Sequence, residues 1–342
     1  GNLALSPHPS SELVHGVCRI ACIATAMLGN WMLLFLVALL FQLWRVLRRY
    51  LRRQLVESDA VLVTGCDSGF GLRIVKALVE KTEAAVFAGY VTQEGSRALA
   101  SLGPRVHPVP LDVTKDAEVQ DAFAEVASSG KSLRGVVNNA GLGAYGWCEA
   151  VSMERYEQNL RINLLGAIRV TKAALPLLRR SRGRLVTMGS MSGRCPSAFG
   201  SAYIPTKAAL ASFQDCVRQE VYRFGVRCSL VEPGFFATGM LHRAATLGEH
   251  ASARTETQAE DALEGYEPFS SKMKRCEGSV LQCERLNGGE RGVDRVTDAV
   301  LDGLVARFPN AYYLVGVDAN ILGRLAPLIP SWVMDLAQTY VV

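Results

Sequence analysis

Tyr203 and Lys207 stand four residues apart in the run Tyr-Ile-Pro-Thr-Lys, and Ser190 precedes the tyrosine by thirteen residues. Residues i and i+4 share one face of a helix, so the phenol and the ammonium are expected to be neighbours. A nearby ammonium favours the phenolate and would lower the tyrosine pKa toward the working pH of a general acid/base. Ser190 could then hold a substrate oxygen. The pattern is short, and an ordinary exposed Tyr and Lys on a helix is the alternative.

A glycine-rich turn at residues 64–71 favours the catalytic interpretation of Tyr203 and Lys207 over that of two ordinary surface residues. The turn reads Thr-Gly-Cys-Asp-Ser-Gly-Phe-Gly, follows an apolar strand-like run at 57–63 and precedes apolar residues at helical spacing. Strand, glycine turn and helix form the context of a dinucleotide site, with the phosphates at the helix N-terminus. Gly65 would take the tight turn, Gly69 would admit a pyrophosphate, and Gly71 would allow close packing. The residues expected to bind the cofactor here are Gly65, Asp67, Ser68, Gly69, Phe70 and Gly71.

The second predicted strand, 85–90, ends where such folds distinguish NAD from NADP. Its tip offers no Arg or Lys to receive a 2′-phosphate, and Asp67 in the glycine turn would repel one. No acidic residue at the tip is available to bind the ribose diol. NAD is therefore favoured and NADP is the less favoured cofactor.

Two further strands are expected to complete the cofactor side of the site. The third, 106–114, ends in Asp112, which would meet the adenine edge or cap the next helix, 115–128. The fourth breaks at 136–141 into Asn-Asn-Ala-Gly, where buried amides need partners. Asn138 is expected to link neighbouring strands, and Asn139, Ala140 and Gly141 are expected to lie by the cofactor.

The remaining elements would deliver the reactive groups. A fifth strand, 182–190, carries Ser190 to its C-terminal end, where α/β sheets bind ligands. A sixth strand, 226–232, runs into Pro233 and Gly234. Asn163 lies in an expected helix around 156–163, where a lone asparagine is usually a solvated surface residue.

The length of 342 residues suits one large α/β domain with appendages. The net charge of +5 comes from five arginines at positions 45–53, without which the balance is about zero, so nucleic acid is not an expected partner. The nine cysteines form no C-x-x-C pair, and no His cluster has metal-ligand spacing, so no metal site is expected.

Residues 20–44 are almost wholly apolar, and these 25 residues exceed the roughly 20 that span a bilayer as a helix. A cleaved signal peptide and a buried core helix are the alternatives. The arginines that follow would keep the rest of the chain on the cytosolic side. The expected division is a tail at 1–19, an anchor at 20–44, a basic linker at 45–56 and a catalytic domain at 57–342.

The motifs at 64–71, Leu-Asp-Val-Thr at 111–114, Asn-Asn-Ala-Gly, Ser190, Tyr203-x-x-x-Lys207 and Pro233-Gly234 occur in one order. In that order and spacing the chain resembles the classical short-chain dehydrogenase/reductase family. The glycine turn and the run Val-Glu-Pro-Gly-Phe-Phe at 231–236 look like its membrane-associated retinol and hydroxysteroid dehydrogenase branch, which also contains 3-hydroxybutyrate dehydrogenases. The match covers 57–240 well and 293–342 loosely.

The resemblance implies a fold: one doubly wound, Rossmann-like α/β domain with a parallel sheet of about seven strands and a helical substrate lid at 241–292. It also implies roles. Tyr203 would be the acid/base, Lys207 would lower its pKa and bind the nicotinamide ribose, and Ser190 would bind the substrate oxygen. Asn163 would hold a proton-relay water, and Thr238 would meet the nicotinamide carboxamide. Pro205 departs from the pattern and requires the helix to begin near Ser201 or Ala202.

The activity implied is NAD-dependent oxidation of a secondary or allylic alcohol on a retinoid or steroid. A 3-hydroxybutyrate dehydrogenase and an NADPH-dependent carbonyl reductase are the enzymatic alternatives; the former needs a cation for the carboxylate, and Arg194 is a candidate, although a solvated arginine is the plainer interpretation. A catalytically silent nucleotide-binding membrane scaffold is the remote alternative.

The expected partners are a small hydrophobic substrate and membrane lipid, with a homodimer as an option. The expected location is the endoplasmic reticulum membrane, with the catalytic domain cytosolic and the mitochondrial inner membrane as the alternative. The apolar C-terminal stretch, 321–342, is either a core helix or a shallow membrane contact.

Overall fold

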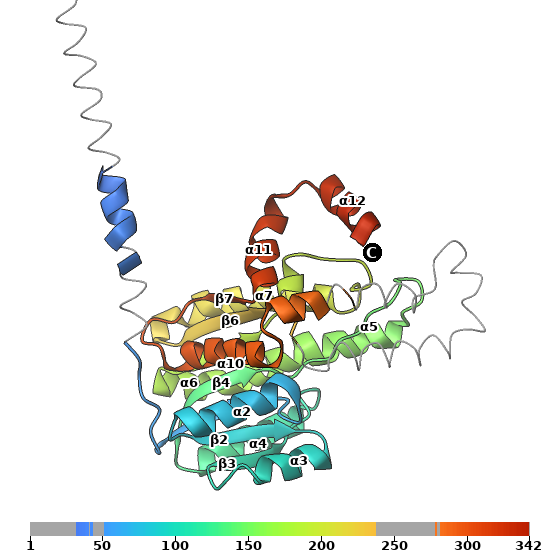
Figure 1. Ribbon diagram of the computed structural model, residues 1–342. Coiled ribbons are helices and arrows are strands. Elements are labelled where there is room, and N and C mark those ends of the chain that lie inside the picture. Colours follow the sequence, from blue (N-terminus) through green and yellow to red (C-terminus); the bar gives the residue numbers. More distant parts are fainter. Residues whose placement is uncertain (1–31, 41, 44–50, 237–277, 279–280, 342) are drawn as a thin grey trace, which may run out of the picture. The chain divides into compact units, whose positions relative to one another are not determined.

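The computed structural model describes residues 32–40, 42–43, 51–236, 278 and 281–341 (Figure 1). The chain divides into two compact units, Gly1–Arg52 and Arg53–Val342. In the first unit, residues 32–40 and 42–43 are helical and exposed. Within the described residues no helix is both long and apolar enough for a membrane span. Much of the predicted anchor at 20–44, most of the predicted lid at 241–292 and Thr238 lie outside the described residues.

The second unit is built on one seven-stranded sheet with the order β3-β2-β1-β4-β5-β6-β7 (Figure 1). Every neighbouring pair of strands is parallel. The order reverses between β1 and β4, which is the switch point of a doubly wound fold. The predicted Rossmann-like α/β architecture is confirmed. The strands are β1 Asp59–Val63, β2 Ala85–Tyr90, β3 Val106–Pro110, β4 Ser132–Asn138, β5 Arg184–Met188, β6 Arg227–Pro233 and β7 Tyr312–Val315.

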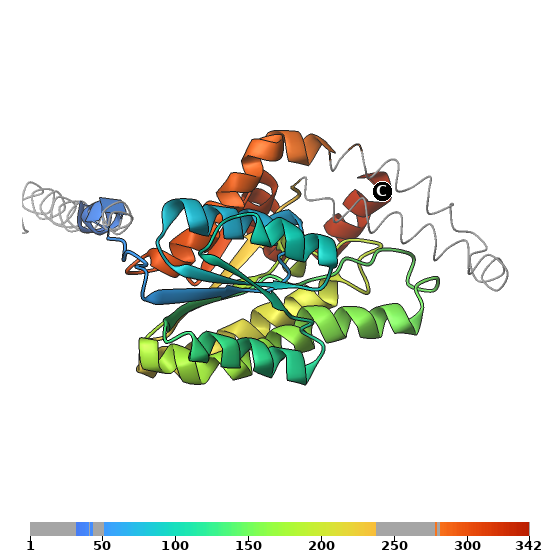
Figure 2. The ribbon, with the colours of Figure 1, turned by 90° about the horizontal axis from the view of Figure 1, so that it is seen from below.

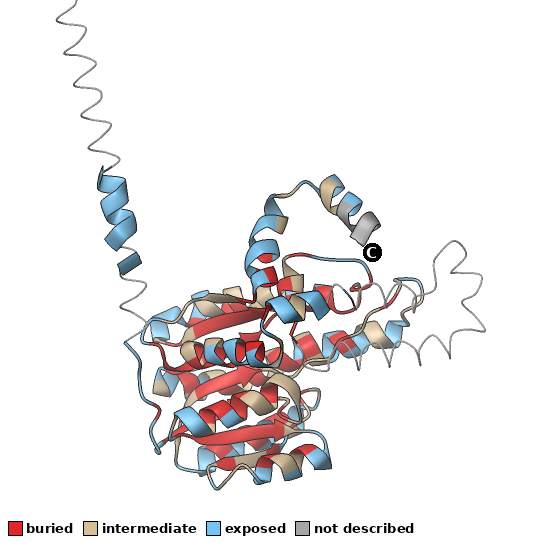
Figure 3. Ribbon diagram, in the orientation of Figure 1, coloured by how far each residue is buried: buried red, intermediate tan, exposed pale blue. Residues whose placement is uncertain are grey.

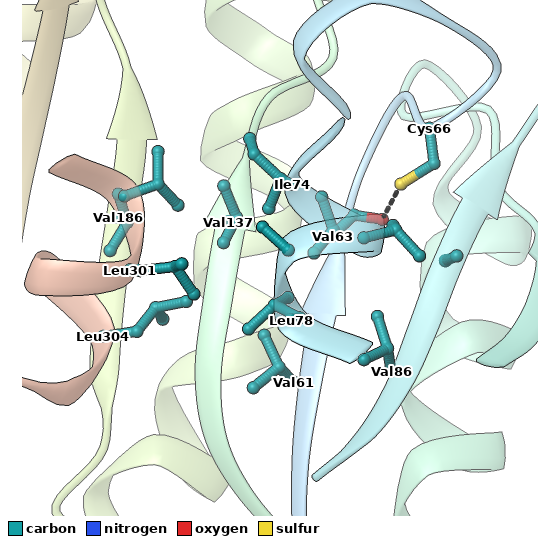
Figure 4. Close-up of a cluster of buried hydrophobic side chains, with 14 of the residues drawn as sticks. Val61, Val63, Cys66, Ile74, Leu78, Val86, Val137, Val186, Leu301 and Leu304 are labelled. Carbon is teal, nitrogen blue, oxygen red and sulfur yellow. Dashed lines mark hydrogen bonds between the residues drawn. The ribbon is translucent and has the colours of Figure 1, made fainter. Parts of the chain in front are cut away.

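Helices cover both faces of the sheet (Figure 2). One core cluster joins Ile74, Leu78 and Leu301 to Val61 and Val137, and Figure 4 shows these side chains between helix and sheet. These helices are α2 Gly69–Lys81, α3 Gln93–Ala100 and α10 Gly289–Val305. Burial on both faces explains why the central strands β1 and β2 are nearly continuous apolar runs rather than alternating ones, and Figure 3 shows the central strands buried.

The opposite face has a second core cluster, in which Leu62, Phe87 and Leu185 of the strands meet Phe123 and Leu178 of the helices. Its helices are α4 Asp116–Ser128, α6 Ala167–Ser181 and α7 Ile204–Val221. Before α6 the chain forms α5 Met153–Asn159 and a π-helical turn, η1 Leu160–Gly166. After β5 comes a short 3-10 turn, η2 Met191–Gly193, and after α7 a second, η3 Tyr222–Phe224.

The C-terminal helices α11 Val317–Leu325 and α12 Ser331–Val341 flank a short 3-10 turn, η5 Ala326–Leu328. Up to residue 336, where burial is described, most large apolar side chains of this stretch are exposed, with Leu328 of η5 at 79% and Trp332 of α12 at 67%. A core helix, one of the two sequence-based alternatives for 321–342, is therefore wrong for residues 321–336. Contact with lipid stays a proposal.

Candidate active site

The glycine turn between β1 and α2 has the backbone that its sequence predicts. Gly65 and Gly69 have φ of 67° and 59°, in the left-handed region that favours glycine. A Cβ on Gly71 would lie 2.1 Å from the Gly65 carbonyl oxygen, so only glycine lets α2 begin this close to the turn. The predicted conformational roles of Gly65 and Gly71 are confirmed.

Asn139 ties the glycine turn to the end of β4. Its amide nitrogen Nδ2 donates to the carbonyl oxygens of Thr64 and Gly65, both at 2.9 Å. The Thr64 hydroxyl accepts from the backbone N–H groups of Asn139 and Ala140 at 3.0 and 2.9 Å. The prediction that Asn138 links the strands is wrong: its Nδ2 donates to Thr171 Oγ1 on α6 at 3.0 Å. Successive residues of a strand point to opposite faces, so Asn138 faces the helix layer.

A cavity of about 360 Å³ opens along the carboxyl ends of β1, β2 and β4. Nine of the predicted cofactor residues line it, which are Gly65, Asp67, Ser68, Gly69, Phe70, Asp112, Asn139, Ala140 and Gly141. Its position at the switch point of the sheet, with a helix N-terminus on the wall, fits a dinucleotide. Gly71 supports the turn from behind rather than lining the cavity.

Two carboxylates in this cavity are fixed by local hydrogen bonds. Asp67 Oδ1 accepts from Thr92 N at 2.8 Å and from Thr92 Oγ1 at 2.7 Å, and it also accepts from Val91 N. The Asp67 carboxylate therefore stands at the tip of β2. Asp112 accepts from Thr114 N and Oγ1, while the cap of α4 is Lys115, so Asp112 is not the N-cap residue. The third strand ends at Pro110, two residues before the predicted Asp112.

Ser190, Tyr203 and Lys207 line a second cavity, of about 90 Å³, together with Gly141, Pro233 and Gly234. Two elements bring these residues together. Ser190 follows the end of β5, and Lys207 lies in the first turn of α7. Tyr203 is the residue before α7, and residues 201–203 form a turn, so the helix begins later than the predicted Ser201 or Ala202. Pro205 still falls in the first turn, where proline is tolerated.

Burial sets the protonation of the two reactive groups. Burial raises the pKa of Tyr203 to about 12, against which a hydrogen bond with Ser190 acts. Burial also lowers the pKa of Lys207 to about 8. Lys207 Nζ lies 5.8 Å from the centre of the Tyr203 ring and donates to the Met188 carbonyl oxygen at 2.8 Å. The pKa of Tyr203 is thus raised by desolvation rather than lowered as the spacing to Lys207 suggested, and the phenol is protonated at neutral pH.

Asn163 is a buried anchor and not a solvated residue, which corrects the expectation for a lone asparagine in a helix. It is 1% exposed and lies in the π-helical turn η1. Its Oδ1 accepts from Leu142 N at 2.7 Å, and its Nδ2 donates to Leu142 O at 2.9 Å and to Thr206 Oγ1 at 3.0 Å. Asn163 therefore joins the loop after β4 to the start of α7. The role of holding a relay water stays a prediction.

Arg194 closes the turn after Ser190; its side chain is 32% exposed and is paired with a buried carboxylate. Its Nε donates to both carboxylate oxygens of Glu232, at 2.8 and 2.9 Å, and Glu232 is 1% exposed. Burial raises the pKa of the Glu232 carboxyl, while the hydrogen bond from Arg194 acts against this. Sequence reasoning missed this pair. The signal was a single glutamate in the otherwise apolar run 230–233, which must find a partner once the strand is buried.

A second missed feature holds the segment after β6. Asp318 Oδ2 accepts from Phe235 N at 2.7 Å, and Asn287 Nδ2 donates to Phe235 O at 2.9 Å and to Asp318 Oδ1 at 2.8 Å. A Cβ on Gly234 would lie 2.0 Å from Asp318 Oδ1, so glycine is required beside this carboxylate. Residues far apart in the sequence thus fix Pro233, Gly234 and Phe235 against the cavity.

The depressed pKa of Lys207 predicts a pH-dependent stability. Between pH 8 and the ordinary value of 10.5, the folded protein has released a proton that the unfolded chain retains. Unfolding takes up that proton, so the unfolding free energy rises with pH in this window. From pH 8 to pH 10 we expect the unfolding free energy of the wild type to rise by about 2 kcal/mol relative to that of Lys207→Met. Denaturant unfolding of both proteins at several pH values measures this. Parallel pH profiles for the two proteins would contradict the buried, weakly basic Lys207.

Comparisons with known proteins agree with this geometry. A family model described as short chain dehydrogenase matches residues 59–247. Mouse retinol dehydrogenase 16 is 34% identical over 312 residues, with 89% of this chain and 96% of the relative covered. Bovine 17-beta-hydroxysteroid dehydrogenase type 6 is 32% identical with the same coverage. Bovine mitochondrial D-beta-hydroxybutyrate dehydrogenase is 38% identical over 271 residues, 75% of this chain and 77% of the relative.

Among solved structures, a short chain dehydrogenase from Burkholderia cenocepacia J2315 in complex with NADP superposes with a TM-score of 0.60. It is 21% identical, and 82% of this chain and 96% of that chain are covered. At this identity the likeness concerns the fold alone.

Proposed function

Because the chain belongs to the short-chain dehydrogenase family, as an NAD(P)-dependent alcohol dehydrogenase related to retinol and hydroxysteroid dehydrogenases, we propose that it oxidises a hydrophobic alcohol with NAD. The substrate is a secondary or allylic alcohol of the retinoid or steroid class. The observation that carries the proposal is the meeting of Ser190, Tyr203 and Lys207 in one cavity beside the glycine turn.

Each reactive residue has a task that its position allows. The nicotinamide ring supplies the hydride acceptor and, when oxidised, a positive charge that favours the phenolate. Ser190 binds the alcohol oxygen and holds it near the Tyr203 hydroxyl. Tyr203 takes the hydroxyl proton as hydride leaves the carbinol carbon, and Lys207 stabilises the phenolate and binds the ribose. Positioning and local charge supply most of the rate.

The lining of the 90 Å³ cavity supports a hydrophobic substrate. Besides the reactive residues, large apolar and aromatic side chains form its walls, namely Phe70, Tyr145, Met188, Met191, Phe235 and Phe236. The Tyr145 ring lies 5.5 Å from the Tyr203 ring, centre to centre. Such walls bind apolar and conjugated molecules and leave short polar acids poorly held.

A hydroxybutyrate dehydrogenase is the second candidate, favoured by the identity of 38% to the bovine enzyme. A carboxylate substrate needs a cation in the substrate cavity. Among the described residues that line it, Lys207 is the only cationic side chain, and Arg194 is paired with Glu232. A retinoid or steroid alcohol therefore fits better. A silent scaffold is disfavoured because it has no need of the grouped Ser190, Tyr203 and Lys207.

The test is NAD reduction followed by absorbance with retinoids, steroids and short hydroxy acids offered separately, and NADPH-dependent reduction of the matching carbonyls. We expect turnover with a retinoid or steroid alcohol. Efficient turnover of 3-hydroxybutyrate alone would replace the proposal by the second candidate, and faster reduction with NADPH would replace it by a carbonyl reductase.

The preference for NAD rests on Asp67, whose carboxylate stands at the tip of β2. Asp67→Asn keeps an oxygen that can accept from Thr92 N and removes the negative charge. We expect NADPH binding to strengthen roughly fivefold, with NADH binding nearly unchanged, since one charge a few ångströms away is worth about 1 kcal/mol in a wet site. Titration of the cofactors by fluorescence measures this. Asp121→Asn, an exposed acid on α4 outside the cavity, is the control, and equal effects of both variants would contradict the preference.

We also propose attachment to the endoplasmic reticulum membrane with the catalytic domain on the cytosolic face, and a homodimer as the assembly. The arginines at 45–53 after the apolar run support the orientation. Protease added to intact microsomes should digest the chain after Arg53. Protection until detergent is added would reverse the orientation.

A further inference from the structure

Seven arginines gather where two turns meet at the amino-terminal edge of the sheet. The segment 178–184, which joins α6 to β5, reads Leu-Arg-Arg-Ser-Arg-Gly-Arg and contains no acid. The segment 218–227, which joins α7 to β6, contributes three more arginines and one acid, Glu220. The active site lies at the opposite, carboxyl edge. We name this group the arginine corner, comprising Arg179, Arg180, Arg182, Arg184, Arg218, Arg223 and Arg227.

The two segments are in direct contact. Arg227 N donates to Gly183 O at 3.2 Å, and a Cβ on Gly225 would lie 3.4 Å from the Arg182 side chain. The guanidinium carbons of Arg179 and Arg223 lie 5.3 and 4.7 Å from the centre of the Phe224 ring. The turns thus bring cations from two helices around one aromatic side chain.

A surface hollow lies between the turns, lined by Arg179, Arg182, Tyr222, Arg223, Phe224 and Gly225. Its volume is about 530 Å³, which is enough for a phosphate and the group that carries it. No acidic side chain is among the lining residues. The hollow therefore offers cations and aromatic rings and nothing that would repel an anion.

Few acids neutralise the arginine corner. Arg218 pairs with Asp215 at 3.0 Å, and the adjacent Arg134 pairs with Asp59 at 2.9 Å. Within the described part of the chain, Arg179, Arg182 and Arg223 form no ion pair. Burial and, after it, the neighbouring cations Arg227, Arg53 and Arg134 together lower the pKa of Arg184 to about 10. Cations crowded in this way create a strongly positive surface that attracts anions.

The surroundings favour a lipid surface over other anions. Tyr222 is 63% exposed, and amphipathic aromatic side chains beside cations are typical of the membrane interface. Arg53, the first residue of the globular unit, lies close enough to Arg184 to depress its pKa. The globular unit therefore begins at this edge of its sheet, and the apolar and arginine-rich sequence of 20–52 precedes it in the chain.

We propose that the arginine corner binds the phosphate groups of anionic phospholipids, with the exposed aromatic rings at the level of the headgroups. The site is separate from the catalytic cavity and does not rest on the proposed alcohol oxidation. Each arginine near an anionic leaflet strengthens binding roughly fivefold, so three exposed arginines together matter on the order of a hundredfold.

The experiment is hydrogen exchange on the full chain in lipid nanodiscs, comparing phosphatidylcholine alone with phosphatidylcholine containing about 30% phosphatidylserine. We expect several-fold slower exchange of the amides in 179–184 and 222–227 with the anionic lipid, and loss of this protection at high salt. The triple variant Arg179→Gln/Arg182→Gln/Arg223→Gln should show no difference between the two lipids. A matched triple variant, Arg97→Gln/Arg291→Gln/Arg295→Gln, removes exposed arginines from α3 and α10 and should behave as wild type.

Two added arms separate lipid from other anions, both in discs of phosphatidylcholine alone. Inorganic phosphate in one arm and a single-stranded oligonucleotide in the other should leave exchange of the two segments unchanged. Equal protection by inorganic phosphate would replace the lipid surface by a free-phosphate site, and stronger protection by the oligonucleotide would replace it by a nucleic-acid site. Absence of protection by the anionic lipid, or protection that survives the triple substitution, would overturn the proposal.

Discussion

Tyr203→Phe should reduce turnover by roughly a thousandfold while leaving NAD binding nearly unchanged, because general acid/base catalysis contributes about that factor. The substitution removes one hydroxyl and keeps the ring that packs 5.5 Å from Tyr145. The phenol is 5% exposed, so solvent has little access to replace it as proton acceptor. Steady-state kinetics and cofactor fluorescence measure the two quantities separately.

The matched control is Tyr145→Phe, which removes the hydroxyl of a second tyrosine in the same cavity. Its turnover should fall less than about tenfold, since the proposed mechanism assigns the proton transfer to Tyr203 and makes Tyr145 part of the cavity wall. If Tyr203→Phe kept a tenth or more of the wild-type turnover, or if both variants lost activity equally, Tyr203 would not be the acid/base.

Arg194→Met should destabilise the fold by about 3 kcal/mol at neutral pH, because it leaves the carboxylate of Glu232 buried without its cation. Burial already raises the pKa of Glu232, and without Arg194 it would rise further. When a carboxyl has a higher pKa in the folded state than in the unfolded state, the protein loses stability as pH rises above the unfolded-state pKa. The stability lost by Arg194→Met should therefore grow from acidic to neutral pH. Denaturant unfolding at several pH values measures it.

Arg194 is also a positioning residue for the turn that begins at Ser190, so kcat/KM should fall roughly tenfold as the serine shifts. The double variant Arg194→Met/Glu232→Gln should recover much of the stability, since no charge is left buried. Arg73→Met removes an arginine from an exposed pair with Asp294 and should cost less than about 0.5 kcal/mol. Similar costs for Arg194→Met and Arg73→Met would contradict the importance of the buried pair.

The central strands β1 and β2 could be predicted because they are short apolar runs that are buried on both faces. Their arrangement in a parallel sheet was what the family resemblance implied. The second strand, Ala85–Tyr90, matches its predicted bounds, and the glycine turn takes the conformation that its spacing requires. These features depend on local sequence. They are the part of the fold that hydrophobic pattern and glycine placement determine.

The errors concern long-range contacts. Whether Asn138 or Asn139 ties the strands together depends on which residue falls beyond the end of β4, and the sequence does not mark that point. Asn163 lies in the π-helical turn η1 and pairs with Leu142, 21 residues away, and no local pattern predicts either feature. Glu232, the partner of Arg194, lies 38 residues away in the chain. Phe235, the partner of Asp318, lies 83 residues away. No spacing rule reveals either pair.

Protonation was the other error. The i, i+4 spacing of Tyr203 and Lys207 suggested a lowered tyrosine pKa, but spacing carries no information on desolvation. Both side chains are buried, and burial raises the pKa of Tyr203 and lowers the pKa of Lys207, which favours the neutral form of each group. We therefore expect the positive charge of the bound oxidised cofactor to add to that of Lys207 in favouring the Tyr203 phenolate.

The most direct measurement of the central claim is transfer of deuterium from the carbinol carbon of an alcohol to NAD. The full chain is incubated with NAD and a retinoid or steroid alcohol deuterated at that carbon, and the reduced cofactor is examined by mass spectrometry. A dehydrogenase built on Ser190, Tyr203 and Lys207 predicts reduced nicotinamide that carries the deuterium, formed by wild type and nearly absent with Tyr203→Phe. Reduced cofactor without the label, or none with any hydrophobic alcohol, would contradict the account.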